Sequence, residues 1–567
     1  MKNITFDMFK YERPDFEIQK EQLMTLIKEF SLATTSANQL ALFQKINEAR
    51  SHVSTMKTIA SIRHSVDTRD AFYDAENTYW DEMGPLYTEL NALLYDALLS
   101  SQFRNELEAE LGAQFFKLIE CSQKAFSPAI IEDLQEENRL DSEYSKLIAS
   151  AKIKFQGEEY TLPGLTKFSQ DKDRQVREAA LTARFNFFTE NEATIDNIYD
   201  KLVKVRDKIA KKLGFNSFTE LGYLRMKRTD YNANDVANFR KQVRDVIVPV
   251  ATEIYEKQRK RLGLEQLRYF DLPFEFESGN ATPKGDPAWI LEQGKRMYAD
   301  ISPSTQEFFD FMVEKKLLDL ENKDGKRGGG YCTYISGHKA PFIFSNFNGT
   351  SADIDVLTHE AGHAFQVFRS RHIEIPELNL PTYDSCEIHS MSMEFFCWPW
   401  MQLFFEEDVE KYQYSHLAHA IKFIPYGVLV DEYQHFVYDN PQATSLERKN
   451  EWRRLEKQYL PHKDYTGCDF LERGGWWHQQ GHIFGMPFYY IDYTLAQICA
   501  LQFWKRMNNG DRDGAWQDYV ALCDVGGSKS FVELVKLGNL KSPFADGSVA
   551  TIIGDIKAWL DIPRDLK

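Results

Sequence analysis

The residues best suited to chemistry are His359, Glu360 and His363, which form an H-E-x-x-H motif. On a helix, side chains four residues apart share a face, so both imidazoles can bind one metal ion. Glu360 is rotated about 100° from His359, which leaves it near the metal but free to handle a proton. The motif therefore predicts a zinc hydrolase with two His ligands and a Glu general base.

The residues around the motif predict the helix that it needs. Thr350 and Ser351 are suitable N-caps, and Asp353 follows in the first turn. Apolar residues then recur at helical spacing. Gly362 is unusual there, because a glycine inside a helix costs about 1 kcal/mol relative to alanine. A close approach by substrate or by another helix would explain it.

A catalytic zinc ion needs a third protein ligand and an open position for water. Gln366 and Arg369 stand where a metzincin would have Gly and His, so that class is excluded. Glu387 comes near the start of a second predicted helix, after the cap Asp384-Ser385, and the spacing favours it. The candidates downstream are His372, Glu374, Glu377, Glu387, His389 and Glu394.

The segments HEAGHAFQ and CEIHSMSMEFF resemble the thimet oligopeptidase and oligoendopeptidase F family of metallopeptidases. The resemblance is greatest to the bacterial oligoendopeptidase F and Pz-peptidase branch, and it extends from about Tyr223 to Phe503. It implies that Glu387 is the third ligand of one zinc ion per chain. It also implies a zinc-dependent endopeptidase that cleaves internal bonds of short, unfolded oligopeptides.

A second segment, H-x-x-x-x-P-F-Y-Y-x-x-Y, begins at His482. Pro487 is a plausible first-turn proline of a helix that carries Tyr490 and Tyr493 on one face. A phenol or an imidazole near a tetrahedral intermediate can donate a hydrogen bond to the developing oxyanion. The segment resembles the family's His and Tyr substrate-binding segment, which implies this role for His482 and for Tyr490 or Tyr493. An aromatic core helix is the alternative interpretation.

Several other His and Glu residues have weaker patterns. Glu394 lies seven residues after Glu387 and is a candidate for orienting a ligating histidine, or a structural ion-pair partner. His416, His419 and His435 show no ligand-like pairing beyond the three-residue spacing of the first two. We expect structural roles for these three histidines.

The elements that must position these residues are mostly helical. Residues 1–150 show the three-to-four spacing of long amphipathic helices, and residues 153–162 read as a small hairpin with Gly157 in its turn. Helical patterns continue from 171 to Gly214, a C-cap position, and again to 263 and over 287–320. Two strands are predicted at 331–335 and 341–347, beside the zinc helix, where an extended peptide could pair.

The family resemblance implies a mainly α, neurolysin-like metallopeptidase fold with a deep substrate channel and a small β-element beside the zinc helix. We expect residues 1–200 to form an N-terminal helical region that roofs the channel. Residues 201–567 would then form the catalytic zinc-peptidase region.

Composition limits the partners and the compartment. A formal net charge of −17 over 567 residues argues against a nucleic-acid partner. The sequence contains no run of 18 apolar residues, so it predicts no membrane span. The N-terminus also lacks the apolar core of a signal peptide. Seven cysteines without a C-x-x-C pair indicate free thiols. We therefore expect a cytoplasmic protein.

Two alternatives stay open at this point. The first is a zinc exopeptidase with the same motif, either a carboxypeptidase or an aminopeptidase. The second is a non-catalytic peptide-binding protein whose zinc is structural or absent. Glu360 argues against the second alternative, because a structural site has no need of a general base.

Overall fold

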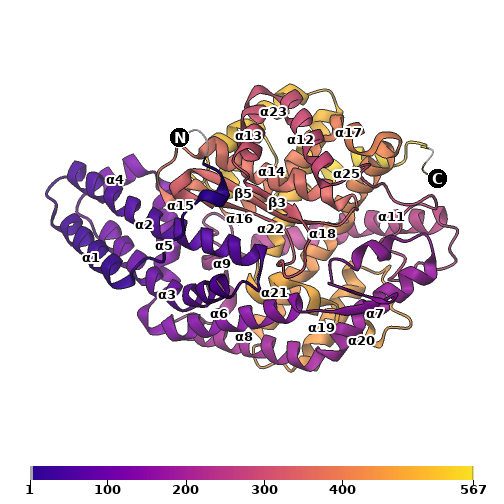
Figure 1. Cartoon of the computed structure of the whole chain (residues 1–567), viewed down its shortest axis with the longest axis horizontal. Coiled ribbons are helices and arrows are strands. Elements are labelled where there is room, and N and C mark those ends of the chain that lie inside the picture. The colour runs from indigo at the N-terminus through magenta and orange to yellow at the C-terminus, as the bar shows by residue number, and fades with distance from the viewer. Residues whose placement is uncertain (1–3, 565, 567) are drawn as a thin grey trace.

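Helices make up 69% of the structure, and the strands among the described residues form two small sheets. This computed structural model describes residues 4–564 and 566. The mainly α architecture predicted from the sequence is confirmed. In Figure 1 the N-terminal helices, in indigo and violet, occupy the left end and the lower edge, while α14 and α16 lie near the centre.

The first 150 residues form the long helices that their apolar spacing predicts. Side-chain caps define where these helices begin: Thr35 Oγ1 accepts the backbone N–H of Asn38, and the Asp70 carboxylate accepts two backbone N–H groups. Their bounds are α1 (Phe16–Leu32), α2 (Ser36–Val66), α3 (Ala71–Leu99), α4 (Arg104–Leu111), α5 (Ala113–Lys124) and α6 (Ile131–Ala149).

The predicted hairpin and helix end are also present. Strands β1 (Ile153–Phe155) and β2 (Glu158–Tyr160) pair antiparallel, and Gly157 lies in their turn with φ of 87°. Gly214, with φ of 86°, follows the end of α8. The helices that follow are α7 (Arg174–Glu190), α8 (Glu192–Lys212), α9 (Phe218–Arg225), α10 (Ala233–Gln242) and α11 (Val248–Arg261).

The helical prediction for residues 287–320 is wrong in part. The segment divides into α12 (Pro287–Ile301), α13 (Pro303–Glu314) and a strand, β3 (Leu318–Glu321). Ser302 caps α13 by accepting the Thr305 N–H at 3.2 Å, and Pro303 fits the first turn of a helix but not its interior. The chain therefore turns at residue 302.

Both strands predicted beside the zinc helix exist, as β4 (Tyr331–Ile335) and β5 (Ala340–Phe347). The order in the sheet is β3-β5-β4, with β5 parallel to β3 and antiparallel to β4. Strand β4 is thus an edge strand. The hairpin between β4 and β5 closes through Ser336–His338.

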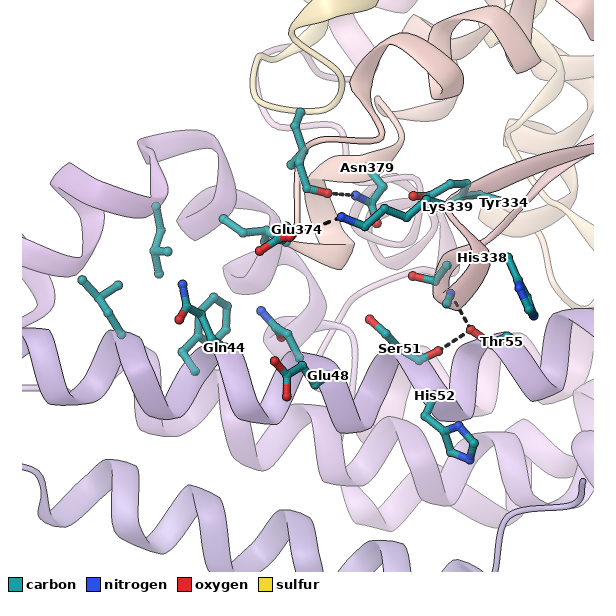
Figure 2. A pocket seen from close by; sticks show the side chains of 18 of the residues that line it. Gln44, Glu48, Ser51, His52, Thr55, Tyr334, His338, Lys339, Glu374 and Asn379 are labelled. Carbon is teal, nitrogen blue, oxygen red and sulfur yellow. Dashed lines mark hydrogen bonds and ion pairs between the residues drawn. The ribbon is translucent and has the colours of Figure 1, made fainter. Parts of the chain in front are cut away.

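Helix α2 holds the tip of this hairpin. The Gly337 N–H donates to Thr55 Oγ1 at 2.7 Å, and a Cβ at Gly337 would lie 2.8 Å from the same oxygen. Figure 2 shows the cavity of about 760 Å³ beside this contact, with Gln44, Glu48 and His52 of α2 among its labelled side chains. The N-terminal helices and the sheet therefore meet through an ordered contact.

Four helices pack together at the centre of the molecule: α14 (Ala352–Ser370), α16 (Tyr383–Phe396), α18 (Val409–Asp439) and α22 (Tyr490–Asn508). Most of their length is buried. The remaining helices are α15 (Pro376–Asn379), α17 (Gln402–Phe405), α19 (Ser445–Tyr459), α20 (Asp469–Glu472), α21 (Gly481–Gly485), α23 (Arg512–Asp524), α24 (Phe531–Leu537) and α25 (Ala550–Leu560).

Three predicted details of helix starts need correction. At α14, Ser351 makes no side-chain cap; instead the Asp353 carboxylate accepts the N–H groups of Asn348 and Gly349. Pro487 is not in the first turn of α22, because Phe488 adopts φ of 67° and the helix begins at Tyr490.

The third detail concerns α16. This helix begins at Tyr383 with Thr382 as its N-cap, so Asp384 and Ser385 lie inside the first turn and Glu387 in the second. The earlier start places Glu387 within a fully formed part of the helix. Its position is therefore fixed by backbone hydrogen bonds on both sides.

None of the helices in the described residues combines the length and apolar character that a membrane span requires. All seven cysteines are free, as predicted. The division of the chain at residue 200, and the roofing role of the first part, stay predictions.

Candidate metal centre

Two imidazoles and one carboxylate meet between α14 and α16. His359 Nε2 and His363 Nε2 lie 3.2 Å and 3.3 Å from the same oxygen, Oε2 of Glu387. The three ligand atoms lie within 4.8 Å of one another. Two His and one Glu form a donor set that catalytic zinc sites use, with a position left open. The residues therefore fit a zinc ion.

The close contact of the two helices explains the glycine in the motif. A Cβ on Gly362 would lie 2.6 Å from the backbone oxygen of His389 and 2.6 Å from Ser390 Cα. No side chain fits there without moving backbone. Ser390 Oγ also donates to Glu387 Oε2 at 2.8 Å, which fixes that carboxylate. Of the two explanations considered for Gly362, the structure supports the approach of another helix.

Glu387 is almost completely buried in this contact. Burial alone would raise the pKa of its carboxyl group, but the imidazoles of His363 and His359 lower the pKa well below its ordinary value. The carboxylate is thus held in the ionised form that a metal ligand requires.

A second layer of polar groups orients His359. Its Nδ1 lies 2.7 Å from Glu394 Oε1, and Glu394 Oε2 lies 2.7 Å from His416 Nε2. The Trp398 indole N–H donates to His416 Nδ1 at 3.0 Å. Because this N–H makes Nδ1 an acceptor, His416 donates from Nε2 to Glu394. Glu394 therefore lies where it could orient His359, the first of its two candidate roles, and His416 contacts its other oxygen.

Glu360 is buried next to the two imidazoles, with only 6% of its surface exposed. Its Oε2 has no hydrogen-bond partner among the described residues. Burial raises the pKa of this carboxyl group, and His359 and His363 oppose the increase. The position of a Cβ on Gly330 would be 3.4 Å from Glu360 Oε1, so the segment leading into β4 lies directly beside this group.

His482 is held as a neutral hydrogen-bond donor. The Tyr426 hydroxyl donates to Gln480 Oε1 at 2.7 Å, which leaves the Gln480 amide nitrogen to donate to His482 Nδ1 at 3.0 Å. The proton of the neutral ring then resides on Nε2. Burial lowers the pKa of His482 to about 4, so the ring is neutral at ordinary pH.

The predicted tyrosines surround this histidine. Tyr493 Oη lies 3.3 Å from His482 Nε2, and the Tyr490 ring lies 5.1 Å from the His482 ring between centroids. Tyr490 also packs against Phe423, whose ring centroid is 5.7 Å away. The structure therefore brings His482, Tyr490 and Tyr493 into one cluster.

Tyr489 also belongs to this cluster, and the sequence alone does not show which of Tyr489, Tyr490 and Tyr493 contacts the oxyanion. Its hydroxyl donates to Glu387 Oε1, the carboxylate oxygen that does not face both imidazoles. Its ring stacks over His482 with a centroid separation of 5.5 Å. The signal was its four-residue spacing from Tyr493, which places both rings on one side of the start of α22. Tyr489 thus connects the aromatic cluster to the candidate metal ligands.

Comparison with known proteins shows the family of this chain. A model of the peptidase M3 N-terminal domain matches residues 6–126, and the model of peptidase family M3 matches residues 167–282 and 304–552. The chain belongs to peptidase family M3. The family resemblance predicted from the two motif segments is confirmed.

Two solved structures are similar to this chain to different degrees. A structure of Pz peptidase A with an inhibitor is 56% identical, with a TM-score of 0.98, over 99% of this chain and 100% of that one. An oligoendopeptidase F from Enterococcus faecium is 15% identical, with a TM-score of 0.61 over 96% of this chain and 97% of that one. This second likeness concerns the fold alone.

Two curated relatives are described as oligoendopeptidase F homologues. The one from Borreliella burgdorferi is 23% identical over 64% of this chain, and the one from Mycoplasma genitalium is 21% identical over 66%. The chain spans 61% of the length of each of these relatives.

Proposed function

We propose that this M3 family member is a zinc-dependent endopeptidase that hydrolyses internal bonds of short, unfolded oligopeptides. The observation that carries the proposal is the meeting of His359 Nε2 and His363 Nε2 at one oxygen of Glu387. Glu360, with an unpartnered buried oxygen, lies beside it. A purely structural metal site would have no use for that carboxylate.

His359, His363 and Glu387 would hold one zinc ion. When bound, the ion would lower the pKa of a water molecule and polarise the scissile carbonyl group. Glu394 and His416 would keep the His359 ring in its ligating orientation through the two 2.7 Å contacts.

Glu360 would act as the general base. Its carboxylate would accept a proton from the attacking water and pass that proton to the amine that leaves. Burial beside the imidazoles raises its pKa, which makes it a stronger base than an exposed carboxylate. Its unpartnered Oε2 is available for this proton.

His482 and the tyrosines would stabilise the oxyanion that develops on the scissile carbonyl. The Nε2–H of neutral His482 and the hydroxyl of Tyr493 lie together, 3.3 Å apart, and either can donate a hydrogen bond. We retain Tyr490 as a candidate at the same cluster. Because Tyr489 already donates to Glu387, we assign it to holding that ligand.

The edge strand supports an extended peptide as the substrate. Strand β4 has a sheet neighbour on one side only, so its other side offers backbone groups for pairing. The residue before β4, Gly330, lies beside Glu360, so a peptide paired with this strand would pass the general base. This arrangement favours unfolded peptides over folded proteins.

An internally quenched peptide with both ends blocked tests the proposal. We expect the purified protein to cleave it at an internal bond, to lose this activity with a chelator, and to regain it with zinc. Cleavage only of peptides with a free terminus would indicate an exopeptidase. Failure of the zinc-loaded protein to cleave any of several peptides would indicate a peptide-binding protein.

A further inference from the structure

A second cavity adjoins the His482 cluster. Its volume is about 500 Å³, and Gln480, Phe423 and Tyr426 form part of its wall. The same Gln480 amide contacts His482 Nδ1 at 3.0 Å, and Phe423 packs against Tyr490. The cavity is therefore one layer of side chains away from the groups assigned to the oxyanion. We call it the basic cavity, for the charge of its lining.

The lining carries positive charge and no carboxylate. Aromatic side chains form much of the wall, and three of the lining residues are basic or titratable to a cation. The chain as a whole has a net charge of −17, so the charge of this lining is opposite in sign to that of the whole chain. The described residues that line it are Tyr255, Leu272, Pro273, His419, Lys422, Phe423, Tyr426, Leu460, Lys463, Trp476, Gln479 and Gln480.

Two of the three basic groups already contact a buried carboxylate that lies outside the cavity lining. Lys422 Nζ donates to Glu275 Oε1 at 2.6 Å and to Gln258 Oε1 at 3.0 Å. His419 Nε2 lies 3.1 Å from the same Glu275 oxygen. Glu275 is fully buried and does not line the cavity.

Lys463 is different, because its ammonium group makes no ion pair within 4 Å among the described residues, although the buried carboxylate of Glu456 attracts it from further away. Its Nζ lies 3.1 Å from the centroid of the Trp476 ring, and Tyr465 is the next ring at 5.6 Å. Burial lowers the pKa of Lys463 to about 8. An amine in this state gains most from the arrival of an anion, since an unpaired buried charge is costly.

We propose that the basic cavity binds the C-terminal carboxylate of the peptide substrate, with Lys463 as the group that receives it. The proposal rests on the peptidase function proposed above and adds how the substrate is oriented. The aromatic wall would cover the last side chains of the peptide, while the ammonium group pairs with the carboxylate.

The position of the cavity agrees with this orientation. Helix α11, which contributes Tyr255, lies to the right of α14 and α16 in Figure 1, whereas α2 lies to their left. The cavity of Figure 2, on the α2 side, is lined by the carboxylates of Glu48, Glu110 and Glu374, together with Lys339. Its lining therefore carries more acidic than lysine side chains, unlike the lining of the basic cavity.

The test measures peptide binding separately from cleavage. Affinities are determined by calorimetry on zinc-loaded Glu360→Gln protein, so that bound peptide is not consumed. Three peptides are compared: one with a free C-terminal carboxylate, the same sequence as the C-terminal amide, and an amidated form that ends in Glu. We expect the free carboxylate to bind about ten-fold or more tightly than the plain amide, the gain typical of a charged hydrogen bond.

Lys463→Met should abolish this preference, because methionine keeps most of the unbranched aliphatic side chain but has no ammonium group to pair with the carboxylate. Lys463→Arg should retain most of it. Lys457→Met is the matched control, since that lysine is 64% exposed on α19 and does not line the cavity. It should leave the preference unchanged.

Equal affinity for the free and amidated peptides, or no binding of either, would overturn the proposal, as would a preference that survives in Lys463→Met. A Lys463-dependent gain for the peptide ending in Glu would support the cavity and identify a side-chain carboxylate as a second source. Chelator-sensitive cleavage by the unsubstituted protein is measured in a separate assay. A failure of the proposed peptidase function can therefore be distinguished from a failure of the proposed carboxylate site.

Discussion

Glu394 joins two histidines that come from different helices. It contacts His359 on α14 and His416 on α18, each at 2.7 Å. We predict that Glu394→Gln lowers zinc affinity by about ten-fold to a hundred-fold, because the amide weakens the hold on the His359 ring. Competition with a chromogenic chelator measures this.

The matched control for this change is Glu374→Gln, whose side chain is 72% exposed and pairs with Lys339. It should leave zinc affinity unchanged. If Glu394→Gln binds zinc as tightly as the unsubstituted protein, then Glu394 has only a structural role.

The sequence predicts the residues that lie within one motif or within two helix turns of another candidate. His359, Glu360 and His363 are adjacent in the chain, and Glu394 follows Glu387 by seven residues. His416 had no such signal, because its contact with Glu394 depends on how α18 packs. Tyr489 lies four residues before Tyr493 and Tyr490 lies three residues before it, and both spacings place two rings on one helix face, so the sequence alone does not separate them.

Helices α14 and α16 can approach closely only because residue 362 has no side chain. We predict that Gly362→Ala destabilises the protein by about 1–3 kcal/mol, since the new methyl group would meet backbone atoms at 2.6 Å. It should also weaken zinc binding, because Glu387 is on the helix that must move. Urea unfolding and zinc competition measure the two effects.

Gly554→Ala is the matched control for this helix glycine. Gly554 lies inside α25, and a Cβ there would meet nothing within 4 Å. Alanine should therefore stabilise the protein by up to about 1 kcal/mol through its helix propensity. If Gly362→Ala left the free energy of unfolding unchanged or increased it, the proposed close packing would be contradicted.

At the scale of elements, the amphipathic helices and the β4–β5 hairpin could be predicted because their patterns are local. The break at Ser302 has a local signal in Pro303, but the apolar periodicity continues across it and predicts a single helix. Strand β3 could not be predicted from its own residues, since it forms by pairing with β5. The bend before α22 depends on Phe488 at a positive φ, which the sequence does not indicate.

For the whole molecule, a buried carboxylate links helices that are far apart in the chain. Glu137 on α6 accepts from Arg206 Nε on α8 at 2.6 Å and from Arg225 Nη1 on α9 at 2.9 Å. Arg206 Nη1 also donates to the Tyr438 hydroxyl on α18 at 2.9 Å. Burial would raise the pKa of Glu137, but Arg225 and Arg206 lower it to about 2.

The lowered pKa of Glu137 predicts how the free energy of unfolding depends on pH. The folded pKa is below the unfolded one, so the stabilisation is complete above pH 4.5 and is lost as the pH falls towards 2. We expect the stability difference between the unsubstituted protein and Glu137→Gln to shrink by about 2 kcal/mol between pH 6 and pH 3. Urea unfolding at several pH values measures it.

Glu136→Gln is the control, because the neighbouring carboxylate is 43% exposed and pairs with Arg139 at the surface. The difference in stability between the unsubstituted protein and Glu136→Gln should stay near zero at every pH. A stability difference for Glu137→Gln that does not change with pH would contradict the assignment of an ionised Glu137 to the folded state.

The candidate zinc site and its general base are tested most directly by titrating zinc into metal-free protein while cleavage of an end-blocked peptide is followed. We predict that activity rises linearly and stops at one zinc ion per chain. Glu360→Gln should bind the same single ion but show a rate about a thousand-fold lower, the range expected for loss of a general base. Full activity in the metal-free protein, or near-normal activity in zinc-loaded Glu360→Gln, would contradict the proposed mechanism.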